Sequence, residues 1–170
     1  MKNKIKILIL SLVFAILQVS LYMRDIKINL LFLFLVYLIF FDDINHALIV
    51  VGVGGLLTDL FTLNFGVHFV SFLVVALVLY YFYHNILPNG RLITYLLLNF
   101  LGFIIFHIVY YLFNILIKIL SQGNYLFKWN VAFKDFLIAL SINLIISLII
   151  YKLIHLFSSK TKNKFIMIGS

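Results

Sequence analysis

The chain contains no cysteine and no glutamate, and it has one proline among its 170 residues. Without cysteine it cannot hold a disulfide, a zinc–thiolate site or a cysteine nucleophile. Charge is also scarce, at 11% of residues, whereas 65% are hydrophobic and the mean hydropathy is +1.21. A soluble domain is closer to half apolar, with about a quarter of its residues charged. A water-soluble fold would expose one continuous apolar surface, so the composition predicts an integral membrane protein.

What is present is a series of apolar segments, separated by charged residues, proline, glycine and asparagine. Their unbroken hydrophobicity favours helices over the alternating strands of a barrel. We therefore predict an all-α fold, a single polytopic membrane bundle over residues 1–170 with about six transmembrane helices. The predicted spans are 5–23, 28–41, 47–61, 67–83, 92–116 and 133–156. Segment 28–41 is short for a hydrocarbon core of about 30 Å. If it forms one broken or re-entrant unit with segment 47–61, the number of transmembrane helices is lower than six.

The lysines and arginines predict the orientation of the chain, whose net charge is +8. Six spans place both termini on one side, together with Lys2, Lys4, Lys6, Arg91, Lys152, Lys160, Lys162 and Lys164. The other side holds Arg24, Lys27, Lys118, Lys128 and Lys134. Because lysines and arginines are more numerous on the side that holds the termini, we predict that both termini are cytoplasmic. Because these residues lie at the chain ends and in short loops, we expect no nucleic-acid partner. No A-x-A-like cleavage site follows the first apolar segment, which we therefore expect to be retained as a helix.

Polar and small residues recur at helical spacing in four of the six segments. At about 100° per residue each set lies on one helix face, and such faces meet other helices because lipid supplies no hydrophobic drive between them. Packing between helices is the first interpretation of these faces, and the lining of a small-molecule cavity is the second. The sets are Ser11, Ala15, Gln18 and Tyr22; Gly52, Gly55, Asp59 and Thr62; Asn99, His107, Tyr110, Asn114 and Lys118; and Asn143, Ser147, Tyr151 and His155.

Asp59 is the acid that we single out, because an acidic residue in or at the end of an apolar span is costly and marks a functional position. One hypothesis is that Asp59 pairs with His68, with Arg91 or with a basic residue of a partner. The alternative is that it lies at the membrane surface and caps the turn through Asn64. The sequence leaves both open.

Catalysis and metal binding have little support in the sequence. Asp42, Asp43 and His46 are close enough to suggest a divalent-ion site, but a solvated acidic loop is the commoner use of such a cluster. The chain has no G-x-S-x-G, no glycine-rich phosphate loop and no H-E-x-x-H motif. We expect no enzyme activity, no metal and no cofactor.

The stretch from Asn29 to Tyr83 carries a family resemblance. An apolar segment that includes Tyr37 is followed by the run Gly52-Val53-Gly54-Gly55-Leu56-Leu57-Thr58-Asp59-Leu60-Phe61, and then by Gly66-Val67-His68 and a further apolar span. This arrangement resembles the rod shape-determining protein MreD family, which has a similar size, basic ends and a five-to-six-span layout. The proline often expected at the start of the second span is replaced here by Ile28-Asn29. Beyond Arg91 only the hydropathy is similar.

The resemblance implies a non-catalytic scaffold or regulatory subunit of the bacterial cell-elongation machinery, in the plasma membrane. Its partners would be membrane lipid, an MreC-like single-span protein and, through it, MreB-like filaments and peptidoglycan synthases. The positions that the motif carries over are Gly52, Gly55, Asp59, Gly66 and His68, with structural or interface roles. The alternative is a small-molecule-binding subunit similar to the substrate-capture component of an energy-coupling-factor transporter. Such components carry a small-xxx-small motif on their first helix, and Ser11-xxx-Ala15 resembles that motif weakly.

Overall fold

The computed structural model describes residues 2–24, 26, 28–41, 43–62, 66–87, 92–120 and 129–166. Helices make up nearly all of this part of the chain, and it contains no strand. The all-α prediction is therefore confirmed. The elements are α1 (Lys2–Tyr22), α2 (Leu30–Phe41), α3 (Ile44–Val50), the π-helical turn η1 (Val51–Gly55), α4 (Leu56–Thr62), α5 (Val67–Asn85), α6 (Leu92–Leu120) and α7 (Trp129–Ile166).

Within the described residues, five stretches of helix are long and apolar enough to cross a membrane. The third predicted span is one of them, because α3, η1 and α4 form a single helix without a break in helical backbone dihedrals. It begins at Ile44, three residues before the predicted start. These helices indicate a multi-pass membrane protein. The stretches are Ile5–Tyr22, Ile44–Thr62, Val67–Asn85, Leu92–Ile117 and Phe133–Ile154.

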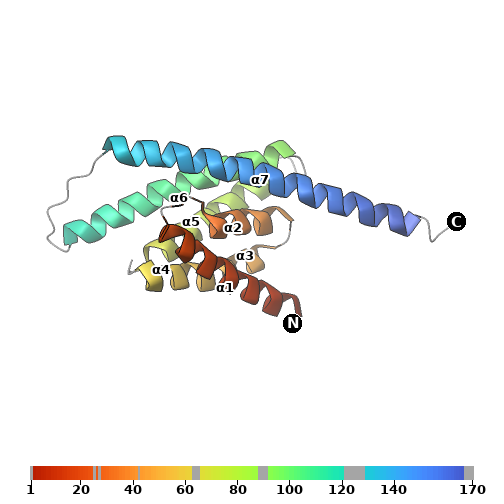
Figure 1. The fold of residues 1–170 in the computed structure, drawn as a ribbon, viewed down its shortest axis with the longest axis horizontal. Helices are drawn as coiled ribbons and strands as arrows, with labels where there is room; N and C mark the ends of the chain where they lie inside the picture. The colour runs from red at the N-terminus through yellow and green to blue at the C-terminus, as the bar shows by residue number, and fades with distance from the viewer. Residues whose placement is uncertain are drawn as a thin grey trace.

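The helices run back and forth between two ends of one bundle (Figure 1). At end A, on the right in Figure 1, α1, α3 and α6 begin. At end B, on the left, α5 and α7 begin, and both run back to end A. The first residue of α1 and the last residue of α7 therefore both face end A. The last part of α7 extends past the other helices there.

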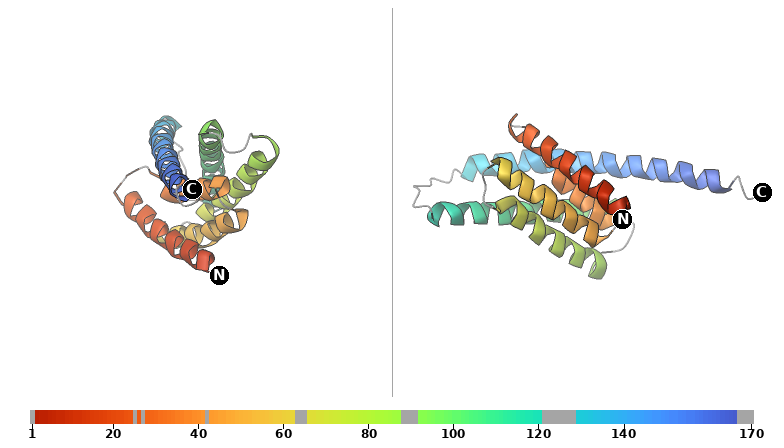
Figure 2. Two further views of the ribbon diagram at one scale, coloured as in Figure 1. Left: turned by 90° about the vertical axis from the view of Figure 1, so that its right-hand side faces the viewer. Right: turned by 90° about the horizontal axis from the view of Figure 1, so that it is seen from below.

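Helix α2 is different, because it is the apolar core of the bundle and is too short to span it. Its 12 residues rise about 18 Å, against about 30 Å for the hydrocarbon core. The end-on view in Figure 2 places it among the other helices. A helix that is apolar all round is expected to be buried. Nine of its residues are buried: Leu31, Phe32, Leu33, Phe34, Leu35, Val36, Leu38, Ile39 and Phe40.

Contacts with α6 and α7 show that α2 occupies only the half of the bundle nearest end A. At its start, Asn29 bonds Asn143, which lies at the middle of the apolar stretch of α7. At its end, Phe40 packs on Tyr95, near the start of α6, with a ring-centroid distance of 5.2 Å. The predicted span 28–41 is thus a half-helix that begins at mid-depth and runs to end A.

Candidate functional site

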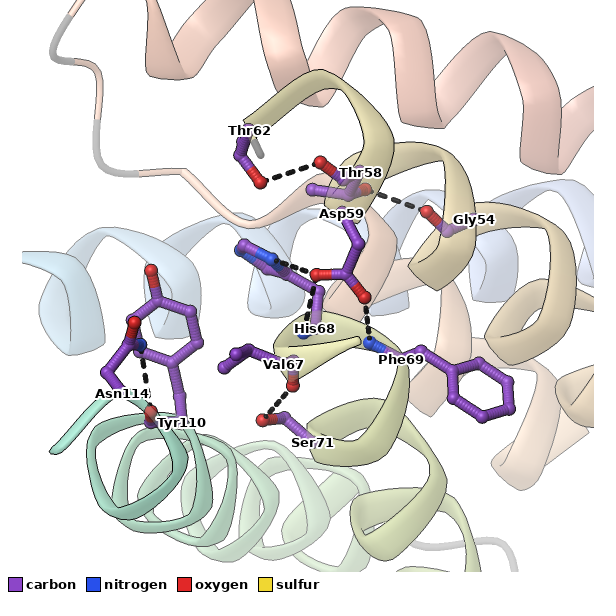
Figure 3. Close-up of polar contacts among 10 residues, drawn as sticks. All are labelled: Gly54, Thr58, Asp59, Thr62, Val67, His68, Phe69, Ser71, Tyr110 and Asn114. Carbon is purple, nitrogen blue, oxygen red and sulfur yellow. Dashed lines mark hydrogen bonds and ion pairs between the residues drawn. The ribbon is translucent and has the colours of Figure 1, made fainter. Parts of the chain in front are cut away.

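Asp59 lies on α4 and joins it to the first turn of α5 (Figure 3). One carboxylate oxygen, Oδ1, accepts a hydrogen bond from the backbone N–H of His68 at 2.8 Å and another from the imidazole Nδ1 of the same residue at 2.9 Å. The second oxygen, Oδ2, accepts the backbone N–H of Phe69 at 2.9 Å. Both Asp59 and His68 are buried. The carboxylate therefore has three donors, which offset the cost of burying its charge.

The sequence of the α4–α5 connection explains why Asp59 is needed there. Gly66 occupies the N-cap position of α5 in the left-handed conformation, with φ of 75°, and it has no side chain that can accept the free N–H groups of the next turn. The carboxylate of Asp59 accepts two of them instead, from the preceding helix. Its negative charge also interacts favourably with the positive end of the α5 dipole.

Gly55 brings the two helices close enough for this capping. A Cβ at Gly55 would lie 2.8 Å from the Cα of Phe69, a backbone atom that cannot move aside. At Gly52, by contrast, a Cβ would meet nothing within 4 Å. Of the two glycines on the face for which the sequence predicts helix packing, Gly55 makes a close approach to another helix and Gly52 does not.

Of the two hypotheses for Asp59, the structure contains the pairing with His68, in a buried position. Asp59 also acts as a cap, although its target is the first turn of α5. Asn64 and Arg91, the other residues named for Asp59, lie outside the described residues. Thr58 and Thr62 support the end of α4 by donating their hydroxyls to the carbonyls four residues earlier, at 2.7 Å each.

The ring of His68 extends from this cap towards two tyrosines. A carboxylate can only accept, so the Nδ1 that bonds Asp59 carries a proton. The other ring nitrogen, Nε2, is buried with no hydrogen-bond partner in the described part of the chain. The ring centroid lies 6.0 Å from that of Tyr22 on α1 and 5.0 Å from that of Tyr110 on α6. The cap therefore also contacts α1 and α6 through its imidazole.

The side chains of Gln18 on α1, Asn143 on α7 and Asn29 itself satisfy backbone groups at the buried start of the half-helix α2. Gln18 on α1 accepts the N–H of Leu30 at 2.5 Å and donates to the carbonyl of Ile28 at 2.9 Å. Asn29 accepts the N–H of Phe32 with its own Oδ1 at 3.0 Å, while its backbone N–H donates to Asn143 on α7 at 3.1 Å. A helix can begin inside an apolar bundle only when such groups replace water.

A cavity of about 210 Å³ lies next to the start of α2. The cavity lies in the end B half of the bundle, into which α2 does not extend. Its walls come from α1, the segment before α2, α6 and α7. The residues that line it are Tyr22, Ile26, Ile28, Asn29, Phe103, Phe106, His107, Tyr110, Tyr111, Asp135, Phe136 and Ala139.

Two polar side chains of the cavity wall have hydrogen-bonding capacity left over. Asn29 uses its side-chain oxygen for the N–H of Phe32, and no described residue accepts from its NH₂ group. His107 donates Nδ1–H to the carbonyl of Phe103 at 3.0 Å, which leaves Nε2 as an acceptor without a partner among the described residues. The wall thus offers a ligand one amide donor and one imidazole acceptor.

Most of the polar faces predicted from the sequence do point inward, and two of them reach this cavity. Ser11, Ala15 and Gln18 are buried on α1, as are Asn99 on α6 and Asn143 and Ser147 on α7; the side chains of Lys118 and His155 lie outside the described residues. Tyr22, His107 and Tyr110 line the cavity. Sequence reasoning missed Asn29 and Asp135 as cavity residues. Asp135 continues the four-residue spacing of Asn143, Ser147, Tyr151 and His155 towards the start of the segment, so helical spacing carried a signal for it. Asn29 precedes its apolar helix, and helical spacing carries no signal for that position.

Of the acidic loop between α2 and α3, the structure describes Asp43. Asp43 is exposed and accepts a hydrogen bond from the side chain of Asn45 at 2.8 Å, which lowers the pKa of its carboxyl group. Asp42 is outside the described residues. Among those that the structure describes, no group of three histidines, cysteines or acids is placed to hold a metal ion.

The fold and these contacts define a polytopic all-α membrane protein with a central half-helix, a buried carboxylate cap and a partly open cavity between helices. Comparisons of the chain with protein-family models, with curated proteins and with solved structures give no match.

Proposed function

We propose that the protein is a non-catalytic membrane scaffold or regulatory subunit of the bacterial cell-elongation machinery, in the plasma membrane, where it binds an MreC-like single-span protein. The observation that carries this proposal is the unit formed by Gly55, Asp59, Gly66 and His68. These are positions of the MreD-like motif, and each one packs or caps the junction of α4 and α5. The resemblance implies that these residues have structural or interface roles.

The outer helices of the bundle provide surfaces for such a partner. Of the α1 and α7 apolar stretches, 22% and 17% of residues are buried inside the bundle, against 39% for α5 and α6. Lipid or another membrane helix can cover the apolar residues of α1 and α7 that are not buried in the bundle. On α1 the exposed apolar residues include Ile5, Leu8, Ile9, Leu10, Val13, Ile16 and Leu17. Small-residue and van der Waals contacts drive such association in lipid.

The proposed topology has six crossings with both termini in the cytoplasm. Although α2 is a half-helix, the chain that precedes it descends from end B to mid-depth, so that the two together make one crossing. End A then carries eight of the thirteen lysines and arginines, and the positive-inside rule assigns it to the cytoplasm.

Co-purification in mild detergent tests the scaffold role. We expect a tagged chain, isolated from its native cells, to recover an MreC-like single-span protein at a constant ratio, and a second tagged polytopic protein from the same cells to recover none. Recovery of an ATPase and a coupling subunit in its place, or of no membrane partner, would contradict the proposal.

The cavity favours a second candidate, a substrate-binding subunit similar to those of energy-coupling-factor transporters. Such a subunit needs a ligand site within a bundle of about six helices, and the partly open cavity beside α2 is lined by residues of α1, α6 and α7. The same co-purification separates the two candidates, since the second requires an ATPase and a coupling subunit.

A further inference from the structure

A groove of about 410 Å³ runs along the outside of the bundle, between α6 and α7, which lie side by side (Figure 1). Every side chain that lines it is apolar, and more than half of these side chains are exposed, so the groove opens outward. A groove of this kind on a membrane protein faces lipid. Its walls are Ile93, Leu96, Leu97 and Phe100 on α6 and Leu144, Ile145 and Leu148 on α7.

The groove lies in the end A half of the bundle. On α6, which begins at end A with Leu92, it reaches from Ile93 to Phe100, or about 10 Å along the helix axis. On α7 it reaches from the middle of the apolar stretch towards end A. Half of the hydrocarbon core is about 15 Å thick. The groove therefore faces the acyl chains of the membrane leaflet at end A.

The side chains of the groove suit an acyl chain better than another helix. Membrane helices pack on one another through small residues, which let their backbones approach closely. The small residues of this part of α6 and α7 point into the bundle instead. A Cβ at Gly102 would lie 2.6 Å from the side chain of Leu79, and Ala139 and Ser147 are buried. The groove itself offers branched and aromatic side chains, between which a flexible acyl chain can lie.

Lys152 supplies a positive charge at the end A side of the groove. It follows Leu148 by about one turn on the same face of α7, and its side chain is exposed. Among the described residues, none forms an ion pair with it. A lysine near the end of a membrane helix extends its ammonium group to the interface, where it attracts the headgroups of anionic lipids.

We propose that one acyl chain of an anionic phospholipid occupies this groove. The phosphate group lies near Lys152, and the chain runs inward between α6 and α7 towards Phe100 and Leu144. This inference rests on the membrane location of the bundle and does not depend on the scaffold role.

Native mass spectrometry of the full chain, released from mild detergent, tests the proposal with two lipids that have the same acyl chains. These are dioleoyl phosphatidylglycerol, which is anionic, and dioleoyl phosphatidylcholine, which has no net charge. We expect one phosphatidylglycerol molecule to be retained per chain, with an affinity about fivefold higher than that of phosphatidylcholine. Equal retention of the two lipids, or a dimer of the chain that retains neither, would overturn the proposal.

A pair of lysine variants locates the headgroup. Lys152→Gln removes the charge beside the groove, and we expect it to abolish the preference for phosphatidylglycerol. Lys134→Gln makes the same change on an exposed lysine at the end B side of the same helix, and we expect the preference to remain about fivefold. If both variants lose the preference to the same extent, the headgroup does not lie at Lys152.

A second pair of variants locates the acyl chain. Leu97→Trp places a larger side chain in the groove, and we expect it to lower the retention of both lipids at least fivefold. Leu112→Trp makes the same change at an exposed position on the other half of α6 and is expected to leave retention unchanged. Unchanged retention in Leu97→Trp would contradict the site. Partner recovery is a separate readout, so failure of lipid retention leaves the scaffold proposal standing.

Discussion

Replacement of Asp59 by alanine is expected to lower the free energy of unfolding by about 3 kcal/mol. The change leaves without acceptors the buried backbone N–H and imidazole Nδ1–H of His68 and the partly buried backbone N–H of Phe69. Each buried donor that loses its partner costs about 1–3 kcal/mol. The loss also removes the negative charge at the start of α5, where the helix dipole favours it.

Unfolding of the reconstituted protein by SDS titration in mixed micelles measures this effect. Asp43→Ala is the matched control, because Asp43 also precedes a helix but is exposed and makes no side-chain cap bond to it. We expect the control to change the unfolding free energy by less than about 0.5 kcal/mol. If the two variants unfold at the same SDS fraction, Asp59 does not hold α5 to α4.

The second large effect is expected at Gly55, where alanine should destabilise the bundle by about 1–3 kcal/mol. The added methyl group would lie 2.8 Å from the Cα of Phe69, so η1 and α5 must separate. This separation also lengthens the hydrogen bonds from Asp59 to the first turn of α5. The two effects therefore act on the same junction and are expected to be non-additive with Asp59→Ala.

Gly52→Ala gives the comparison on the same helical segment. A Cβ there meets nothing within 4 Å, and alanine is the better helix former by about 0.8–1.0 kcal/mol. We expect Gly52→Ala to be neutral or stabilising in the same SDS titration. A destabilisation by Gly52→Ala as large as that by Gly55→Ala would show that helix propensity or lipid contact, and not the approach to Phe69, governs this segment.

Hydropathy was sufficient to predict most of the helices, because membrane helices satisfy their own backbone and need only a long apolar run. The observed stretches Val67–Asn85 and Leu92–Ile117 begin where the apolar runs do. Segment 28–41 is the informative exception. Its length showed that it was short for a span, but only the bonds from Gln18 and Asn143 show where in the bundle it starts.

The candidate site was predicted in part, and the limits have physical causes. Asp59 and His68 lie nine positions apart on two helices, and their pairing was one of several that the sequence allowed. Helical spacing of about 100° per residue placed Gly52 on the packed face with Gly55. The π-helical turn η1 changes that spacing, and Gly54, instead of Gly52, faces the side chain of Leu31. The cavity depends on the distance between α1, α6 and α7, for which a single sequence carries no signal.

Labelling of single cysteines tests most directly the central structural claim, that the half-helix α2 and the chain before it together cross the membrane. The chain has no cysteine of its own, so Arg24→Cys and Asp43→Cys each introduce one reactive thiol at an exposed position on either side of α2. With a membrane-impermeant maleimide we expect Arg24→Cys to react in intact cells and Asp43→Cys to react only after lysis. Reaction of both under the same condition would place them on one side of the membrane and contradict the six-crossing account.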